Sequence, residues 1–204
     1  LQTVCHAKKV CCGFNYTFGA GGRGTEKTLE ILCEKRGIET AVVPAVLEGG
    51  EPISSTRIRG LVARGNMGEA ARLLGRPYGY LGTVCHGRRL GHSLGTPTLN
   101  QRVPQSFVLP RFGVYVSRVW FDGNHYCGVT NVGIKPTVGS KEVLAETWMP
   151  LYEGPDLYGK EIQTELLHFQ RPEHKFPSIE ALKEQIQKDG KAALEFYARN
   201  RNFS

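Results

Sequence analysis

The feature that most constrains the fold of this sequence is a series of strand-like segments in its last two thirds, with no helical pattern between them. Short apolar runs recur there, and Gly, Pro, Asn and Asp residues separate them, which is typical of strands joined by turns. Consecutive strands without intervening helices favour an antiparallel barrel. We expect these strands at residues 80–85, 113–121, 125–132, 143–150 and 160–169.

A helix is expected after the last of these strands. Pro177 and Ser178 form a typical helix start. The apolar residues that follow recur at helical spacing and would form one stripe, with Gly190 as a weak point of the helix. The stripe consists of Ile179, Leu182, Ile186 and Leu194.

The first third of the chain has a different pattern. Apolar runs at 9–13 and 40–46 flank a helical pattern at 27–34, which indicates an α/β layer. Two short helical patterns follow, the first beginning near Ser54 and the second ending at Gly75.

A domain boundary is expected directly after these helical patterns. Pro77 disfavours a helical conformation at Arg76, so the helix should not continue past this point. We therefore expect an α/β domain at 1–75 and a β-barrel domain at 76–204.

The composition narrows the function classes only slightly. Lys and Arg outnumber Asp and Glu by 26 to 19, a net charge of +7, which favours anionic partners such as nucleotide phosphates, nucleic acid or acidic lipid without choosing among them. No apolar run reaches the length of a membrane span, and no signal pattern opens the chain, so we expect a cytoplasmic protein without a membrane partner. The first residue is not Met, and we expect a fragment of a longer protein.

The six cysteines lie mostly in apolar segments and lack the paired C-x-x-C spacing of zinc sites. Reduced thiols in the core are therefore the expected state, and a metal site among them is not expected.

Two formal motif matches are weakened by their surroundings. Residues 19–24 match the glycine pattern of dinucleotide-binding turns, but the aromatic segment 14–18 separates them from the preceding strand, so a surface loop is as good an interpretation. Residues 91–95 match the G-x-S-x-G pattern of serine hydrolases. Because Pro97 follows, the strand-to-helix turn that this motif needs is disfavoured.

The whole segment 87–100 is more informative. Its glycines let backbone N–H groups approach an anion, and its arginines and histidine can supply positive charge. Thr98 and Asn100 are two residues apart, so in an extended segment both side chains share one face and present oxygens to a hard cation such as that of a magnesium nucleotide. A glycine-rich turn in which Thr98 and Asn100 cap backbone groups is the alternative.

At this point the sequence resembles a known family. The segment around Pro97-Thr98-Leu99-Asn100 is similar to the Pro-Thr-x-Asn signature of riboflavin kinases, and four later blocks resemble that family in the same order. These blocks are Gly113-Val114-Tyr115, Asn131-Val132-Gly133-Ile134-Lys135-Pro136-Thr137, Asp156-Leu157-Tyr158-Gly159 and Arg171-Pro172-Glu173-His174-Lys175-Phe176.

The first third resembles the end of the FMN adenylyltransferase domain that bacteria fuse to this kinase. Residues 13–19 and 53–59 carry the similarity. The His-x-Gly-His motif that opens the adenylyltransferase domain does not occur in the chain, so we expect a partial domain with weak or absent adenylyltransferase activity.

The resemblance implies a six-stranded antiparallel barrel with a C-terminal helix, behind a partial Rossmann-like α/β remnant. It implies transfer of the γ-phosphoryl group of ATP to the 5′-hydroxyl of riboflavin, giving FMN, with Mg²⁺ or another divalent cation. Thr98 and Asn100 match the family's cation ligands, and Glu146 matches its proton acceptor, with Glu142 as the nearest competing carboxylate. The expected ATP-binding residues are Gly87, Arg88, Gly91, His92, Gly95, Thr98 and Asn100.

The resemblance also implies a flavin slot and a remnant phosphate site. Trp148 stands where the family often has His, and His92 where it often has Arg or Lys, so flavin contacts and nucleotide affinity are expected to differ. We expect the flavin contacts at Trp148, Leu151, Tyr158 and Arg171, and the remnant nucleotide contacts at Ser54, Ser55, Thr56 and Arg57, where a helix cap is the alternative.

Two other classes of function stay open. A flavin- or nucleotide-binding module without catalysis would keep the pocket and lose the chemistry. A nucleic-acid-binding barrel would need aromatic residues interleaved with its charges, and this pattern is missing, so no nucleic-acid partner is expected. The sequence leaves the oligomeric state open.

Overall fold

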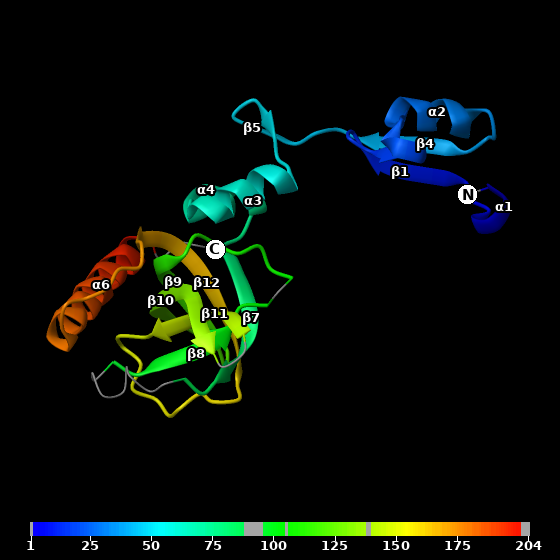
Figure 1. Ribbon diagram of the computed structural model, residues 1–204. Helices are drawn as coiled ribbons and strands as arrows, with labels where there is room; N and C mark the ends of the chain where they lie inside the picture. Colours follow the sequence, from blue (N-terminus) through cyan, green and yellow to red (C-terminus); the bar gives the residue numbers. More distant parts are fainter. Residues whose placement is uncertain (1, 88–95, 105, 138–139, 201–204) are drawn as a thin grey trace. The chain divides into compact units, whose positions relative to one another are not determined.

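The computed structural model describes residues 2–87, 96–104, 106–137 and 140–200 (Figure 1). The chain divides into two compact units, Leu1–Ser54 and Ser55–Ser204. Among the described residues, no helix combines the length and the apolarity needed to cross a membrane.

The first unit is a small α/β layer, as the sequence predicts. Strands β1 (Lys9–Gly13) and β4 (Glu39–Val43) pair in parallel, and helix α2 (Glu26–Glu34) packs on them through a small apolar core. Thr25 caps α2 by accepting a hydrogen bond from the backbone N–H of Thr28. The other elements are α1 (Gln2–Cys5), β2 (Thr17–Phe18), η1 (Ala20–Gly22), β3 (Gly24–Thr25), β5 (Leu47–Glu48) and β6 (Glu51–Pro52).

The glycine-rich segment 19–24 of this unit connects the two strands of a short hairpin, β2 and β3. A dinucleotide-binding turn leads from a strand directly into a helix. This segment is instead a surface loop, which was one of the two interpretations left open by the sequence. Cys5 and Cys11 are exposed in the same unit, so the expectation of core thiols holds for Cys33 and Cys127, which are buried, but not for these two.

The second unit is a closed six-stranded antiparallel barrel with helices outside it, which confirms the expected fold class. The strand order around the barrel is β10-β11-β8-β7-β12-β9, and β9 pairs with β10 to close it. The strands are β7 (Tyr78–Cys85), β8 (Thr98–Arg102), β9 (Gly113–Phe121), β10 (Asn124–Thr137), β11 (Ser140–Trp148) and β12 (Glu161–Arg171).

Strands β10 and β11 extend into the segment between residues 132 and 143, which the sequence predicts to be a turn. Gly133 and Pro136 suggested the end of a strand, yet pairing with β11 continues to Thr137. The pairing of β10 with β9 ends at Val132, so the extension is paired on one side only, and Pro is tolerated at such an edge.

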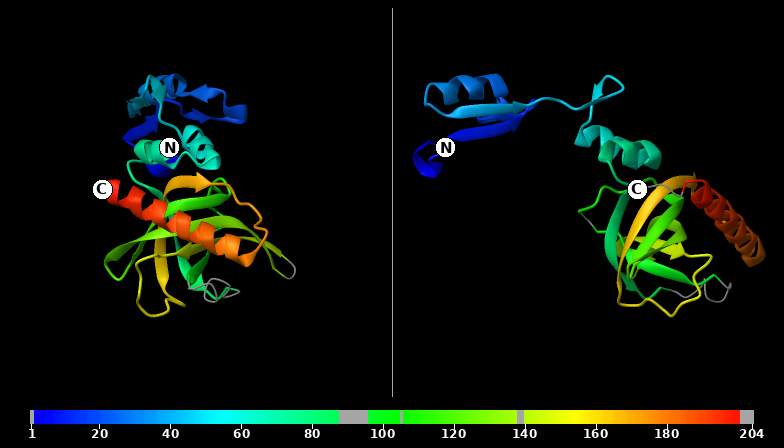
Figure 2. Two further views of the ribbon diagram at one scale, coloured as in Figure 1. Left: turned by 90° about the vertical axis from the view of Figure 1, so that its left-hand side faces the viewer. Right: turned by 180° about the vertical axis from the view of Figure 1, so that it is seen from behind.

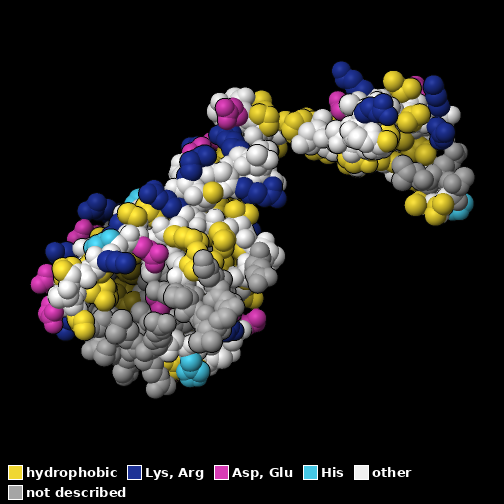
Figure 3. Space-filling view, viewed as in Figure 1, with side chains coloured by type: hydrophobic (Ala, Val, Ile, Leu, Met, Phe, Trp, Pro, Cys, Tyr) yellow, Lys and Arg dark blue, Asp and Glu magenta, His cyan; other side chains and the backbone are white. Residues whose placement is uncertain are grey.

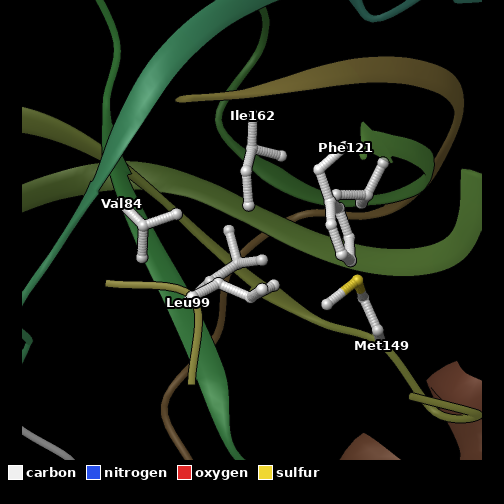
Figure 4. Close-up of a cluster of buried hydrophobic side chains, with 7 residues drawn as sticks. Val84, Leu99, Phe121, Met149 and Ile162 are labelled. Carbon is white, nitrogen blue, oxygen red and sulfur yellow. The ribbon is translucent and has the colours of Figure 1, made fainter. Parts of the chain in front are cut away.

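The barrel interior is filled by side chains that alternate along the strands. One end holds an apolar cluster that includes Val84, Leu99, Phe121, Met149 and Ile162 (Figure 4). Towards the middle the interior is polar, but its hydroxyl and amide groups bond to one another, which offsets the cost of burying them. These bonds link Ser117 to Thr130, Thr130 to Thr147, and Thr164 to Gln101.

Helix α6 (Ile179–Arg199) lies across the outside of the barrel over β9 and β10 (Figures 1 and 2). Ser178 caps it by accepting a hydrogen bond from the backbone N–H of Ala181, as its sequence predicts. Helix α6 continues through Gly190 without a break, and a Cβ at this position would lie 2.5 Å from the Trp148 ring. The missing side chain allows the helix to approach the barrel closely.

Two further helices, α3 (Ser55–Arg64) and α4 (Met67–Leu74), precede β7 and belong to the compact unit of the barrel. Helix α4 contacts β7 and β12, and it ends at Gly75, which has a left-handed conformation as expected for a helix end. The domain boundary expected between residues 75 and 76 stays a prediction.

Candidate functional site

The candidate site is built on two neighbouring strands, β8 and β11. Their antiparallel register places Glu146 directly opposite Asn100, and Trp148 directly opposite Thr98. Because alternate residues of a strand share a face, these four side chains lie on one face of the sheet. It is the outer face, since the intervening Leu99 and Thr147 are buried inside the barrel.

Asn100 is buried, with 5% of its surface exposed, and its side-chain oxygen Oδ1 has no hydrogen-bond partner among the described residues. Gly87, the first residue of the glycine-rich segment 87–100, lies against this amide: a Cβ on Gly87 would be 2.7 Å from Asn100 Cγ. A buried acceptor oxygen without a partner is costly, and a hard cation is one group that can satisfy it. The donor types at Thr98 and Asn100 therefore fit a Mg²⁺ ion.

Glu146 is half-buried and lies between two asparagines. Asn100 of β8 is its cross-strand neighbour on one side, and Asn131 of β10 is its neighbour on the other. The competing carboxylate, Glu142, accepts a hydrogen bond from Arg102 Nε at 3.0 Å and forms an ion pair with it. This bond raises the pKa of Arg102 and engages Glu142 away from the row of Asn100, Glu146 and Asn131.

A cavity of about 100 Å³ opens at the end of the barrel where β8 begins. Thr98 and Tyr158, both expected site residues, line it together with Tyr152 and Leu157. The ring of Tyr158 stacks on that of His86, with 4.1 Å between their centroids. Sequence reasoning missed Tyr152 and His86, although both lie close to blocks that it singled out.

The other three expected flavin contacts do not line this cavity. Trp148 packs against Gly190 of α6, and Leu151 is exposed. Arg171 forms a bidentate ion pair with Asp189 of α6, with 2.7 Å between Nη2 and Oδ2. These contacts attach α6 and the segment after β12 to the barrel, so the structure does not bring the four predicted residues together into one wall.

Most of the expected phosphate loop belongs to a segment that the structure does not describe. Arg88, Gly91, His92 and Gly95 lie outside the described residues.

The expected remnant phosphate site lies at the start of α3. Ser55 and Thr56 begin the helix, and Arg57 forms an ion pair with Glu69 of α4 at 3.5 Å. Lys and Arg side chains are prominent over α3 and α4 in Figure 3. Both interpretations, an anion site and a helix start, stay open.

The closed six-stranded antiparallel barrel with a C-terminal helix is the architecture of riboflavin kinase-like proteins. The chain itself belongs to the riboflavin kinase family, which matches residues 74–197. A second family, described as FAD synthetase, matches residues 1–57.

Several curated relatives carry both families' activities in their descriptions. Bifunctional riboflavin kinase/FMN adenylyltransferases from Listeria monocytogenes, Bacillus subtilis and Escherichia coli are 33%, 35% and 36% identical to this chain. The matches cover 95%, 91% and 93% of the chain, but 62%, 59% and 60% of the relatives. The chain thus spans about three fifths of the length of these relatives.

A crystal structure of a protein from Streptococcus pneumoniae, described as a macrolide-efflux protein, is also similar. It is 33% identical with a TM-score of 0.79, and the match covers 96% of this chain and 61% of that one.

Proposed function

We propose that this chain is an ATP-dependent riboflavin kinase, which transfers the γ-phosphoryl group of ATP to the 5′-hydroxyl of riboflavin and releases FMN. The observation that carries the proposal is the cross-strand pair of Glu146 and Asn100, a carboxylate beside a buried amide oxygen for which the described part of the chain offers no hydrogen-bond partner. Membership of the riboflavin kinase family supports the choice of substrates.

Thr98 and Asn100 would hold the cation of a magnesium nucleotide. Both belong to β8, whose regular pairing with β11 fixes their backbone, so the two oxygens are preorganised before the nucleotide binds. Held there, Mg²⁺ would supply positive charge that offsets the negative charge developing on the phosphate oxygens during transfer. The cavity beside Thr98 gives the nucleotide or the flavin a place to enter the barrel end.

Glu146 would accept the proton of the riboflavin 5′-hydroxyl as that oxygen attacks phosphorus. A carboxylate is a suitable acceptor when it is positioned within hydrogen-bond reach of the attacking hydroxyl. Glu146 is the direct cross-strand neighbour of Asn100, the proposed cation ligand, which fits this role, whereas Glu142 lies four residues earlier in β11 and pairs with Arg102.

We further propose that FMN formation belongs to the barrel unit, because the riboflavin kinase family matches residues 74–197, whereas the FAD synthetase family matches residues 1–57. A cytoplasmic location and the absence of nucleic-acid and membrane partners belong to the same proposal.

The test is to incubate the chain with riboflavin, ATP and Mg²⁺ and to quantify the flavins after chromatography. FMN alone supports the proposal, and FMN with FAD would show that adenylyl transfer is intact. Riboflavin binding without FMN would favour the alternative, a flavin-binding module without catalysis.

A further inference from the structure

Asn131 lies on the side of Glu146 opposite to Asn100. Of its two side-chain amide atoms, the nitrogen forms a hydrogen bond and the oxygen forms none with the described residues. The register of β10 and β11 pairs Asn131 with Glu146 directly. The Asn131 side-chain nitrogen Nδ2 donates a hydrogen bond to Glu173 Oε1 at 3.0 Å. The oxygen Oδ1 is buried and has no hydrogen-bond partner among the residues that the structure describes.

Glu173 determines which atom of the Asn131 amide can bind a ligand. A carboxylate only accepts hydrogen bonds, so the NH₂ group must face Glu173 and the carbonyl oxygen must face elsewhere. The Glu173 carboxylate itself lies against Gly133, where a Cβ would be 2.8 Å from Glu173 Cδ. Because β10 has no side chain at Gly133, the carboxylate reaches the strand surface beside Asn131.

The segment that carries Glu173 is anchored as well. Arg171, two residues earlier, pairs with the buried Asp189 of α6 through both carboxylate oxygens. Arg171 also donates to the backbone oxygen of Pro172, the residue before Glu173. Glu173 is thus positioned both by its own bond to Asn131 and by the anchored residues before it. Such an arrangement is consistent with a preorganised carboxylate.

The place of Asn131 in the sheet indicates what its oxygen can bind. Neighbouring strands are about 4.8 Å apart, so β8 and β10, on either side of β11, are separated by roughly 10 Å. Thr98 and Asn100 define the nucleotide side of Glu146 in the proposed reaction, which leaves Asn131 on the side of the acceptor alcohol. A carbonyl oxygen without a partner suits a hydroxyl donor, and the ribityl chain of riboflavin carries several.

We propose that Asn131, oriented by Glu173, is a specificity-determining residue that accepts a hydrogen bond from a hydroxyl of the ribityl chain. The inference rests on the proposed riboflavin kinase function. It explains why none of the described residues donates to the Asn131 amide oxygen and why the Glu173 carboxylate binds the nitrogen of the same amide. A site with a buried acceptor for a substrate hydroxyl discriminates against ligands that lack the hydroxyl, because they leave this acceptor without a hydrogen bond.

The test compares the binding of riboflavin with that of lumiflavin, which has the same ring system but no polyol chain, by quenching of flavin fluorescence in the full chain. Asn131→Ala should weaken riboflavin binding about tenfold, the scale of one lost hydrogen bond to a buried group, and leave lumiflavin binding unchanged. Asn124→Ala is the matched control, because Asn124 begins the same strand and its side chain donates a hydrogen bond to the nearby backbone oxygen of Asp122. It should change neither affinity.

Glu173→Ala provides a second variant, at an exposed position outside the barrel strands. It should weaken riboflavin binding less, about threefold, because the freed amide can turn either way. An equal loss for both flavins, or no loss for riboflavin in either variant, would overturn the inference while the kinase proposal stands. A loss of Mn²⁺ affinity with unchanged riboflavin binding would also overturn it, in favour of a cation ligand. A wild-type chain that binds no riboflavin would defeat both proposals.

Discussion

Gly87 lies so close to the Asn100 amide that a single added methyl group would overlap it. A Cβ on Gly87 would lie 2.7 Å from Asn100 Cγ. The first residue of the glycine-rich segment therefore closes directly over the oxygen-bearing side chain that we assign to the nucleotide cation. The position of the Asn100 side chain therefore depends on the absence of a side chain at Gly87.

Gly87→Ala should displace the Asn100 amide and weaken binding of the magnesium nucleotide about tenfold. Titration with a fluorescent ATP analogue in the presence of Mg²⁺ measures the effect. Gly68→Ala is the control, since a Cβ on Gly68 in α4 would meet nothing within 4 Å. That variant should bind nucleotide normally and be slightly more stable, by up to about 1 kcal/mol, because Ala favours helix over Gly. Equal nucleotide affinities in both variants would contradict the assigned contact.

Gly190→Ala should destabilise the barrel unit although Ala is the better helix former. The helix gains about 1 kcal/mol from the substitution, while the new Cβ, 2.5 Å from the Trp148 ring, imposes an overpacking cost of about 1–3 kcal/mol. Urea unfolding should show a net loss of about 1 kcal/mol. A variant more stable than the wild type would mean that α6 can shift on the barrel without cost.

Asp189→Asn should cost about 3 kcal/mol of stability, because it leaves the Arg171 guanidinium, largely buried, without its charge partner. The comparison is Asp122→Asn, which breaks an exposed ion pair with Lys160 in the same unit and should cost less than about 1 kcal/mol. Chemical denaturation of both variants ranks them. The same loss in both would show that the Arg171–Asp189 pair contributes no more than a surface contact.

Stability should fall at alkaline pH as buried acids are forced to ionise. Burial raises the pKa of the Cys127 thiol to about 12, and that of the Tyr78 hydroxyl also to about 12. The unfolded chain loses these protons first, so the stabilisation is complete below about pH 9 and is lost as the pH rises towards about 12. Cys127→Val should flatten the first part of this decline in urea midpoints measured across that range. An unchanged profile would show that the thiol does not contribute.

Much of the fold could be predicted because its signals are local. The strand expected at 113–121 is the observed β9, and Ser178 caps α6 as its sequence predicts. The extent of β10 and β11 could not be predicted, since whether Gly and Pro end a strand depends on how many neighbours the strand has there. The role of Gly190 depends in the same way on a ring that lies 42 positions earlier in the chain.

The parts of the candidate site that lie on one strand could be predicted from the sequence. Contacts between residues of different elements could not. Alternation along β8 suffices to place Thr98 and Asn100 on one face. The ion pair of Arg171 with Asp189 could not be predicted from the sequence, because no local pattern indicates a partner 18 residues further on in a helix. A flavin contact at Arg171 stays a prediction. Asn131 carried no signal of its own beyond its place in a family block.

The most direct test of the central claim is turnover of Glu146→Gln beside Glu142→Gln. The account predicts that Glu146→Gln binds riboflavin almost as tightly as the wild type but forms FMN at least about a hundred times more slowly, as expected for loss of a general base. Glu142→Gln should keep near wild-type turnover, because Glu142 pairs with the exposed Arg102. Unchanged FMN formation by Glu146→Gln, or a collapse confined to Glu142→Gln, would contradict the assignment of the proton acceptor.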